Sequence, residues 1–355
     1  MAYGTISADV IQSSVTGVSL GAGNATVFKN RIINGDMRID QRNAGASVTP
    51  INGDYGIDRW KVAMSAASKF SLQQNAGSVT PPTGYINYLG ITSASAYSLS
   101  ASDYFVVRQN IEGLNIADLG WGTANAKTVT LSAWVYSSLT GTFGGALNNS
   151  GSSRSYPFTY SISTANTWTN ISVTIAGDTS GTWLTTNGVG ISVNFSVGTG
   201  TTYSGTAGSW SGSNYVSATG ATSVVGTSGA TFYLTGVQLE VGSSATGFEV
   251  VDYTTQLAMC QRYYQVLGNA VGNEIVIGAY GTTGATVYQT LPCKVTMRTL
   301  PTGVIVGTWY ISNTAQPVFS GAGSSAISLA IVAAATGALV TASSTTAYFT
   351  LSAEL

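Results

Sequence analysis

Aromatic rings set among small polar residues are the strongest hint of chemistry in this sequence. Residues 199–230 are rich in Gly, Ser and Thr, carry no charge, and contain Tyr203, Trp210 and Tyr215. Sugars are neutral and rich in hydroxyl groups, so proteins hold them by ring stacking and side-chain hydrogen bonds. We therefore predict a glycan site at these rings, with Asn214 and Asn194 as polar partners. In the alternative interpretation, the rings fill a core between subunits.

Catalytic groups are scarce. Cleavage of a glycosidic bond needs two carboxyl groups about 5–10 Å apart, and Asp54 with Asp58 is the best available pair. Glu240 and Glu249 fall where satisfying backbone groups is the simpler role. The chain has no histidine, which excludes Ser-His-Asp and Cys-His catalysis and histidine metal sites. We expect no enzymatic activity and no cofactor.

A calcium loop is a weak candidate at Asn52, Asp54 and Asp58, whose spacing suits one. No glutamate stands where it would complete the loop. In the simpler interpretation, Asp58 bonds to backbone or to Arg59, and Trp60 fills the core.

Charge is sparse and unevenly placed. Only 8% of the 355 residues are charged, net charge is −1 and mean hydropathy is +0.22, so nothing attracts nucleic acid or an acidic membrane. Seven of the 13 cations lie between Lys29 and Lys69, whereas no charge falls between Asp178 and Glu240 or between Arg298 and Glu354. Such bare stretches predict surfaces covered by other copies of the chain.

The longest apolar run, residues 326–340, is shorter than the roughly 20 residues of a spanning helix, so we expect no membrane insertion. The two cysteines, Cys260 and Cys293, are interpreted as reduced and buried. A single bridge between them is the alternative.

Alternating apolar and polar residues predict an all-β chain. The expected strands of a first domain suit a jelly-roll sandwich and lie at residues 69–72, 104–109, 128–136, 169–175, 190–197 and 231–240. Gly236 marks a bulge in the last of them. The expected strands of a small second β-domain lie at residues 271–277, 286–290, 291–302, 304–310, 327–332 and 347–351.

Between the two domains the period changes from two to that of a helix. One helical stripe carries Tyr253, Leu257, Cys260, Tyr264 and Leu267, and Asp252 can cap the helix. This stripe predicts a short seam between subunits, too short to hold them alone. The resulting division is a docking arm (1–28), a jelly roll (29–250), a helical joint (251–268) and a C-terminal β-domain (269–355).

Several segments together resemble bacteriophage and prophage tail fibre proteins with carbohydrate-binding-module-like jelly rolls. They are residues 29–37, 41–43, 58–60, 168–183, 234–242, 245–249, 260–264, 297–298 and 352–355. The resemblance covers most of residues 29–302. It implies a virion appendage that works outside the cell after assembly in the host cytoplasm, usually as a trimer. Together with the aromatic segment 199–230, it favours an adhesin that attaches to host-surface glycan.

Two other functions stay open at this point. The chain could be a structural component of the virion, such as a collar or head fibre, with no ligand of its own. Its arm and early charged segment would then dock on another virion protein. A polysaccharide depolymerase is the third hypothesis, and it would rely on the carboxyl pair of Asp54 and Asp58.

Overall fold

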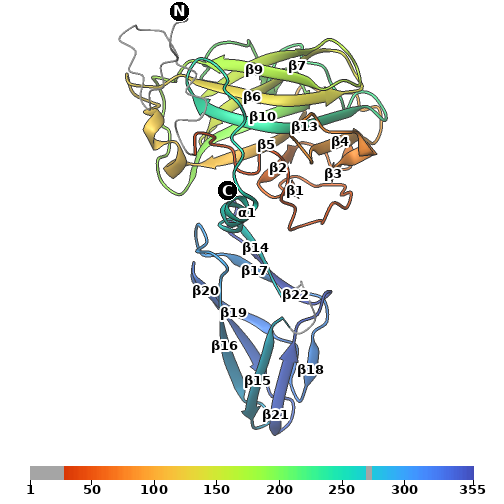
Figure 1. Ribbon diagram of the computed structural model, residues 1–355, viewed down its shortest axis with the longest axis vertical. Helices are drawn as coiled ribbons and strands as arrows, with labels where there is room; N and C mark the ends of the chain where they lie inside the picture. The colour runs from red at the N-terminus through yellow and green to blue at the C-terminus, as the bar shows by residue number, and fades with distance from the viewer. Residues whose placement is uncertain (1–27, 269–273) are drawn as a thin grey trace, which may run out of the picture.

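The computed structural model describes residues 28–268 and 274–355. They form a β-sandwich, a short helix at a narrow waist, and a smaller tapering β-domain (Figure 1). The class is all-β, as predicted. The docking arm predicted for residues 1–28 lies outside the described residues except for Phe28.

Two antiparallel sheets make the sandwich. From β5 onward the long strands pass alternately from one sheet to the other, except for the hairpin of β7 and β8, which is the pattern of a jelly roll. One sheet has, in spatial order, β1 (Tyr55–Ile57), β2 (Trp60–Met64), β5 (Tyr104–Glu112), β10 (Val189–Thr199), β7 (Gly141–Asn149) and β8 (Ser155–Ile162). The other has β3 (Phe70–Gln74), β4 (Leu89–Ser93), β13 (Thr231–Val241), β6 (Val129–Ser137) and β9 (Thr169–Ile175).

The core of the sandwich follows from the alternation in sequence. On β6 the side chains of Val129, Leu131, Ala133 and Val135 are all fully buried between the sheets, because successive residues of a strand face opposite sides. Trp60 is also fully buried, as predicted, and lies 6.3 Å from Phe195 between ring centroids. Short 3₁₀ helices at Ala76–Ser78, Gly113–Asn115, Ala117–Leu119 and Thr201–Tyr203 connect the strands.

The bulge predicted in the last strand of the sandwich is confirmed. The pairing of β13 with β6 slips between Thr235 and Gln238, and Gly236 has φ +61°. A Cβ at Gly236 would lie 2.7 Å from the Tyr85 hydroxyl oxygen. Glycine is therefore needed there both for the backbone angle and for the space.

The helix at the waist is shorter than predicted. It spans Tyr253–Gln261 (α1), and Asp252 caps it as predicted, accepting from the Thr255 N–H at 3.0 Å. Residues Tyr264–Leu267 form strand β14 instead, so the prediction of a helical stripe continuing to Tyr264 and Leu267 is wrong. The cause is tertiary: Gln265 Nε2 donates to the Val295 carbonyl at 2.7 Å, and β14 pairs with β22.

Two of the remaining residues of the stripe, Leu257 and Cys260, face their own chain. Cys260 and Tyr263 are fully buried against Ile33 and Ile39, and Leu257 packs on the same cluster. Tyr253, by contrast, is 57% exposed. The helix therefore locks the waist within one chain and presents no continuous apolar seam to another.

The second domain begins at β14, earlier than the predicted residue 269. Three three-stranded sheets build it. The first has, in spatial order, β14 (Tyr264–Leu267), β22 (Tyr348–Ser352) and β17 (Thr302–Val306), and the second has β15 (Val276–Gly281), β21 (Gly337–Ala342) and β18 (Tyr310–Ser312). The third has β16 (Thr286–Pro292), β20 (Ala326–Val332) and β19 (Val318–Ala322). Its core centres on Trp309 and Phe349, with ring centroids 4.6 Å apart.

Several predictions about the second domain can be judged directly. The edge strand predicted at residues 291–302 is wrong, since most of that segment makes bends whose Cys293 and Met297 N–H groups donate to Ser325 and Ser324. Cys260 is buried, Cys293 is partly buried, and both are free thiols, as expected. In the part of the chain that the structure describes, no helix is long and apolar enough to cross a membrane.

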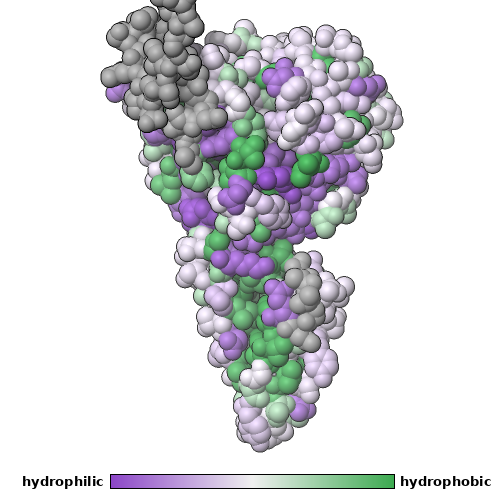
Figure 2. Space-filling model, in the orientation of Figure 1, coloured by the Kyte–Doolittle hydropathy of each residue, from purple (hydrophilic) through white to green (hydrophobic). Residues whose placement is uncertain are grey.

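The second domain also carries apolar side chains outward. Val276, Tyr280 and Tyr310 lie on one sheet and are 57%, 75% and 64% exposed, and Tyr288 on another is 65% exposed. Figure 2 shows apolar surface running down much of this domain, whereas the sandwich is mostly polar on the same side. Of these four residues, Tyr310 falls in the uncharged stretch between Arg298 and Glu354.

Candidate ligand-binding cleft

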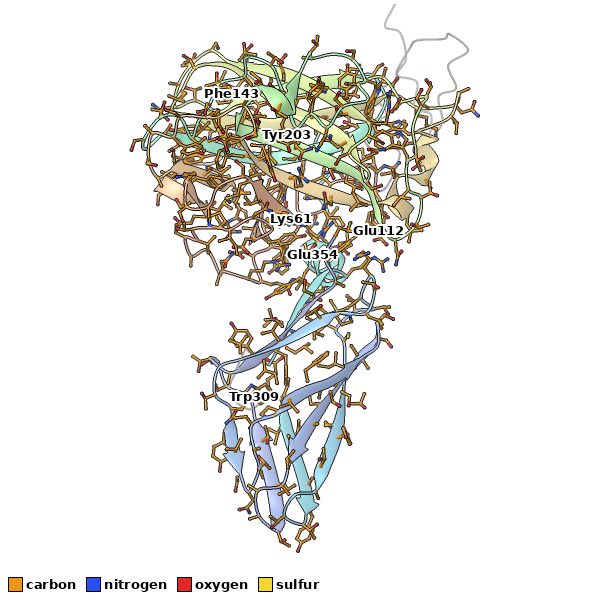
Figure 3. The ribbon with its side chains drawn as sticks, turned by 180° about the vertical axis from the view of Figure 1, so that it is seen from behind. Lys61, Glu112, Phe143, Tyr203, Trp309 and Glu354 are labelled. Carbon is orange, nitrogen blue, oxygen red and sulfur yellow. The ribbon has the colours of Figure 1, made fainter. Side chains whose placement is uncertain are left out.

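Two of the early cations, Arg42 and Arg59, are engaged at the waist. The Arg42 Nη2 atom lies 2.7 Å from Glu354 Oε1, and Arg59 pairs with the same carboxylate. Each guanidinium also covers a tyrosine ring, Arg42 that of Tyr264 at 3.6 Å and Arg59 that of Tyr263 at 3.5 Å. The chain thus brings residues 42 and 354 together across the joint (Figure 3 shows Glu354).

Asp58 is fully buried beside this pair. Its carboxylate accepts from the Gln41 backbone N–H and from Gln41 Nε2. Burial raises the pKa of Asp58 to about 7, although the Arg42 guanidinium 3.6 Å away acts in the opposite direction. Burial alone would lower the pKa of Arg59, but the Glu354 carboxylate reverses the shift and raises it.

A second set of bonds closes the other side of the waist. Arg262 makes a two-point contact with Glu112, at 3.0 and 2.7 Å, and the Tyr263 hydroxyl donates to the same carboxylate at 2.7 Å. Arg298 donates to the carbonyls of Ala353 and Glu354. Because these charges already have partners, the joint is best understood as a structural clasp.

A cleft on the outer face of the six-stranded sheet has the opposite character. It has a volume of about 310 Å³. Lys61 on β2 and Arg108 on β5 line its floor, and Tyr203 and Asn214 approach from the segment 199–230. Figure 3 looks onto the side of the sandwich that carries Lys61 and Tyr203.

Strand register explains why the cations meet. Lys61 stands directly opposite Arg108, and Arg108 stands opposite Asn194 on β10. Residues directly opposite each other in antiparallel strands share a face of the sheet. Three polar side chains therefore form one row across β2, β5 and β10, at the centre of the sheet.

The Arg108 charge in this row has no ion-pair partner among the described residues. The Arg108 Nε atom is buried with no hydrogen-bond partner. Burial lowers the pKa of Arg108, and burial together with the nearby Arg108 charge lowers the pKa of Lys61. Lys61 does donate to the Leu355 carbonyl at 3.2 Å.

Aromatic side chains form one end of the cleft. The rings of Tyr104 and Tyr203 meet edge to face, 5.0 Å apart at 68°, and both are partly exposed. Val106 and Val216 pack beneath them. The short parallel pair of β11 (Ser204–Gly205) and β12 (Ser217–Ala218) holds the segment 199–230 over the sheet.

Two of the five residues predicted as glycan contacts line the cleft, and the other three do not. Tyr203 and Asn214 line the cleft. Trp210 belongs to an aromatic cluster with Trp121, Trp183 and Tyr156, and its Nε1–H donates to the Ala176 carbonyl at 2.8 Å. Trp210 therefore packs within its own subunit.

Tyr215 and Asn194 pack beside and beneath the cleft and do not line it. The Tyr215 ring covers Gly205, where an added Cβ would lie 2.2 Å from the ring. Asn194 is fully buried and uses its Nδ2 group on the Ala146 carbonyl and on Asn148 Oδ1, at 2.9 and 2.8 Å. Asn194 thus lies in the row below the cleft and not at its surface.

The predicted calcium ligands have separate partners. Asn52 Oδ1 accepts from the Met64 N–H, Asp54 Oδ2 from the Ile51 N–H, and Asp58 is held by Gln41. Among the described residues, no group of three or more Cys, Asp and Glu side chains is placed to hold a metal ion. Of the two partners expected for Asp58, the backbone is present, since the Gln41 backbone N–H donates to Asp58 Oδ1. Its other partners are the Gln41 side chain and Arg42 in place of Arg59.

The carboxyl groups considered for hydrolysis have backbone partners. Glu249 accepts from the N–H groups of Phe28 and Asn30, and Glu240 accepts from the Thr246 N–H. This matches the role expected for both. Asp58 is fully buried and Asp54 is exposed, so these two do not face each other across an open site.

Lys61, Tyr104 and Arg108 line the cleft but were not predicted from the sequence. One signal was present: in residues 104–109, Tyr104 and Arg108 fall on the same side of the alternation, opposite Phe105 and Val107. An arginine in the middle of a strong strand needs either a partner or a ligand. The fold decides which strand lies beside Arg108, and the sequence alone does not reveal that this strand is β2, which carries Lys61.

Comparisons with known proteins place the chain among no established family. No protein-family model matches it, and no curated protein matches it. Solved structures similar to it include the enzymatically active domain of bacteriophage CBA120 tailspike protein 4 (10% identity, 60% of this chain and 22% of that one, TM-score 0.33). The chain thus spans about a fifth of that tailspike structure.

Carbohydrate-binding modules are also among the similar structures. One is a CBM4 structure, with 12% identity, 59% of this chain and 98% of that one, and a TM-score of 0.30. Another is a family 11 module of a Clostridium thermocellum cellulosomal cellulase, with 14% identity, coverage of 57% and 99%, and a TM-score of 0.27. At these scores the assignment of the fold rests on the strand order described above.

Proposed function

We propose that this chain is a phage tail-fibre or related virion appendage protein that binds host-surface glycan in the cleft without cleaving it. The observation that carries the proposal is the open cleft itself, where the partly exposed rings of Tyr104 and Tyr203 stand beside polar Asn214. Ring faces beside hydrogen-bonding groups are what a saccharide requires. Glu240 and Glu249 already accept hydrogen bonds from backbone N–H groups, which supports binding in preference to hydrolysis.

Association of several copies, as a trimer, is the second part of the proposal. The outward apolar residues of the second domain, Val276, Tyr280, Tyr288 and Tyr310, support it, because large exposed apolar patches on a soluble protein usually mark an interface. This surface replaces the helical seam as the proposed contact. Multiple copies would raise the effective affinity of a weak glycan site.

Glycan-array binding of the full chain tests the first part. Wild type should bind a subset of surface saccharides, and Tyr203→Ala should lose about 5- to 150-fold in affinity, since a ring in a desolvated contact contributes about 1 to 3 kcal/mol. Tyr253→Ala is the matched control, because Tyr253 is an exposed tyrosine on α1, away from the cleft. It should bind as wild type does.

Two outcomes would contradict this proposal. If wild type binds no saccharide but still assembles, the structural-component function is favoured, with residues 1–28 as the docking arm on another virion protein. If wild type releases sugar from host envelope material, the protein is a depolymerase.

A further inference from the structure

We propose that the cleft selects an anionic saccharide, whose carboxylate or phosphate group binds between Arg108 and Lys61. This inference rests on the proposed function, because it names the class of glycan that the same cleft takes. It departs from the neutral sugar that the composition of residues 199–230 suggested.

The Arg108 guanidinium is the group that we expect to bind the anion. Its Nε is buried and without a partner, and no ion pair satisfies its charge in the described chain. Leaving a partly buried charge uncompensated is costly. A guanidinium presents a planar fork that matches two oxygens of a carboxylate or phosphate. A bound anion would supply the missing partner.

Lys61 adds a second charge at the same place. It stands directly opposite Arg108 in the strand register, so both side chains rise from one row of the sheet into the cleft. Two like charges side by side repel each other. An anion between them is attracted to both, and these two attractions outweigh the repulsion between the cations.

The neighbouring groups do not supply that anion. Glu354 lies near enough to Lys61 to affect its pKa, but it is in ion pairs with Arg42 and Arg59. Asn194, opposite Arg108 on the other side, is neutral. Asp54 is exposed and accepts from the Ile51 N–H. The Leu355 oxygen accepts from Lys61 at 3.2 Å and also from Tyr55 and Asn110, so the charge that lacks a partner in the cleft is that of Arg108.

The distance to the aromatic end of the cleft defines the size of the ligand. Tyr104 and Arg108 are four residues apart on one strand, which corresponds to about 13 Å. A sugar ring stacked at Tyr104 and Tyr203 and an acidic group at Arg108 would belong to different units of one chain. The expected ligand is therefore an acidic oligosaccharide and not a single sugar.

Isothermal titration of the full chain with three probes tests this inference. The probes are an oligogalacturonate, a phosphorylated oligomannoside and a neutral oligosaccharide of matched length. We expect at least one acidic probe to bind about 10- to 100-fold more tightly than the neutral one, as for a charge-assisted contact. The preferred acidic probe identifies carboxylate or phosphate as the group. Its affinity should fall as salt is raised.

Arg108→Gln should abolish the preference for the acidic probe and leave neutral binding unchanged. Lys127→Gln, which removes an exposed cation elsewhere on the sandwich, should change neither. A rise in the denaturation midpoint of unliganded Arg108→Met would show that the variant folds and that the charge is uncompensated. A fall in that midpoint would indicate a structural role for Arg108 and would overturn the inference.

The two proposals fail in different ways. Equal binding of acidic and neutral probes overturns the anionic selection and leaves the glycan-binding function standing, as does an unchanged preference in Arg108→Gln. Absence of binding to every saccharide on the array, acidic and neutral, overturns the proposed function itself.

Discussion

Arg59 and Arg108, both in the sandwich, have opposite surroundings. Arg59 has the Glu354 carboxylate, the Asn110 carbonyl and the Tyr263 ring. Arg108 has none of these. The same side chain therefore serves as a structural clasp at one position and as a candidate recognition group at the other. The difference lies in the partners that the fold supplies, and residue type alone does not reveal it.

Asp58 gives a pH dependence with a definite sign. Its pKa is about 7 in the folded chain, against an ordinary value of 3.8. Between these values the folded state holds a proton that the unfolded state has lost, so stability falls as pH rises. We expect the free energy of unfolding to decrease from pH 5 to pH 7 by up to about 1.4 kcal/mol per pH unit.

Urea unfolding at a series of pH values measures this effect. Asp58→Asn should flatten the dependence in that window, because it removes the group that titrates. Asp54→Asn is the control, since Asp54 is exposed, and it should leave the slope as in wild type. A wild-type stability that rises from pH 5 to pH 7 would refute the assignment.

At the scale of elements, the joint is made from segments far apart in the sequence. Five segments meet at the waist, and each of them is also part of the resemblance to tail fibre proteins. They are residues 41–43, 58–60, 260–264, 297–298 and 352–355. In the structure they supply the clasp of Arg42 and Arg59 on Glu354 and the contact of Arg262 with Glu112. The resemblance therefore describes how the two domains are joined more than it describes a binding site.

Removing the shared carboxylate should weaken the joint. Glu354→Ala leaves Arg59 buried without its partner, and breaking a buried pair in this way costs about 3 to 5 kcal/mol. We expect a lower denaturation midpoint and separate unfolding of the two domains in calorimetry. Asp118→Ala removes an exposed pair with Arg31 and should cost less than about 1 kcal/mol. Equal effects of both substitutions would contradict the clasp.

The sequence predicted elements well where one period dominated. Residues 128–136 alternate without interruption, and β6 begins and ends within a residue of that range. The waist was harder because Tyr264 and Leu267 continue the helical spacing of Cys260. Pairing with β22, about 80 residues away, decided their structure. The Gly-rich β7 has too little alternation to be recognised without its neighbours, and the predicted strand at residues 271–277 overlaps β15 only at Val276 and Ile277.

At the scale of the whole molecule, only part of the cleft could be predicted. Tyr203 and Asn214 were found from the composition of residues 199–230, because that segment is unusual by itself. Lys61 and Arg108 lie 47 residues apart, and only the order of strands places them opposite each other. Trp210 had the same local sequence character as Tyr203, yet it faces a cluster of three other rings.

Assembly of copies can be tested on the outward tyrosines. Tyr280→Lys combined with Tyr288→Lys should convert the assembly to single chains, because each large ring buried in an interface contributes about 1.5 to 3 kcal/mol and a buried lysine adds a cost. Light scattering after size exclusion measures the mass. Tyr253→Lys, on α1, should leave the mass of wild type unchanged. A loss of mass in Tyr253→Lys alone would restore the helical seam as the contact.

The position of residues 353–355 at the waist has a mechanical consequence. The second domain leaves the sandwich through α1 and β14, and β22 runs back beside β14 to the same place (Figure 1). Tension applied at the far tip therefore reaches the sandwich along two neighbouring strands at once. The ion pairs of Glu354 with Arg42 and Arg59 fix the end of β22 to the sandwich. The second domain is therefore attached through two strands, and both share an applied load.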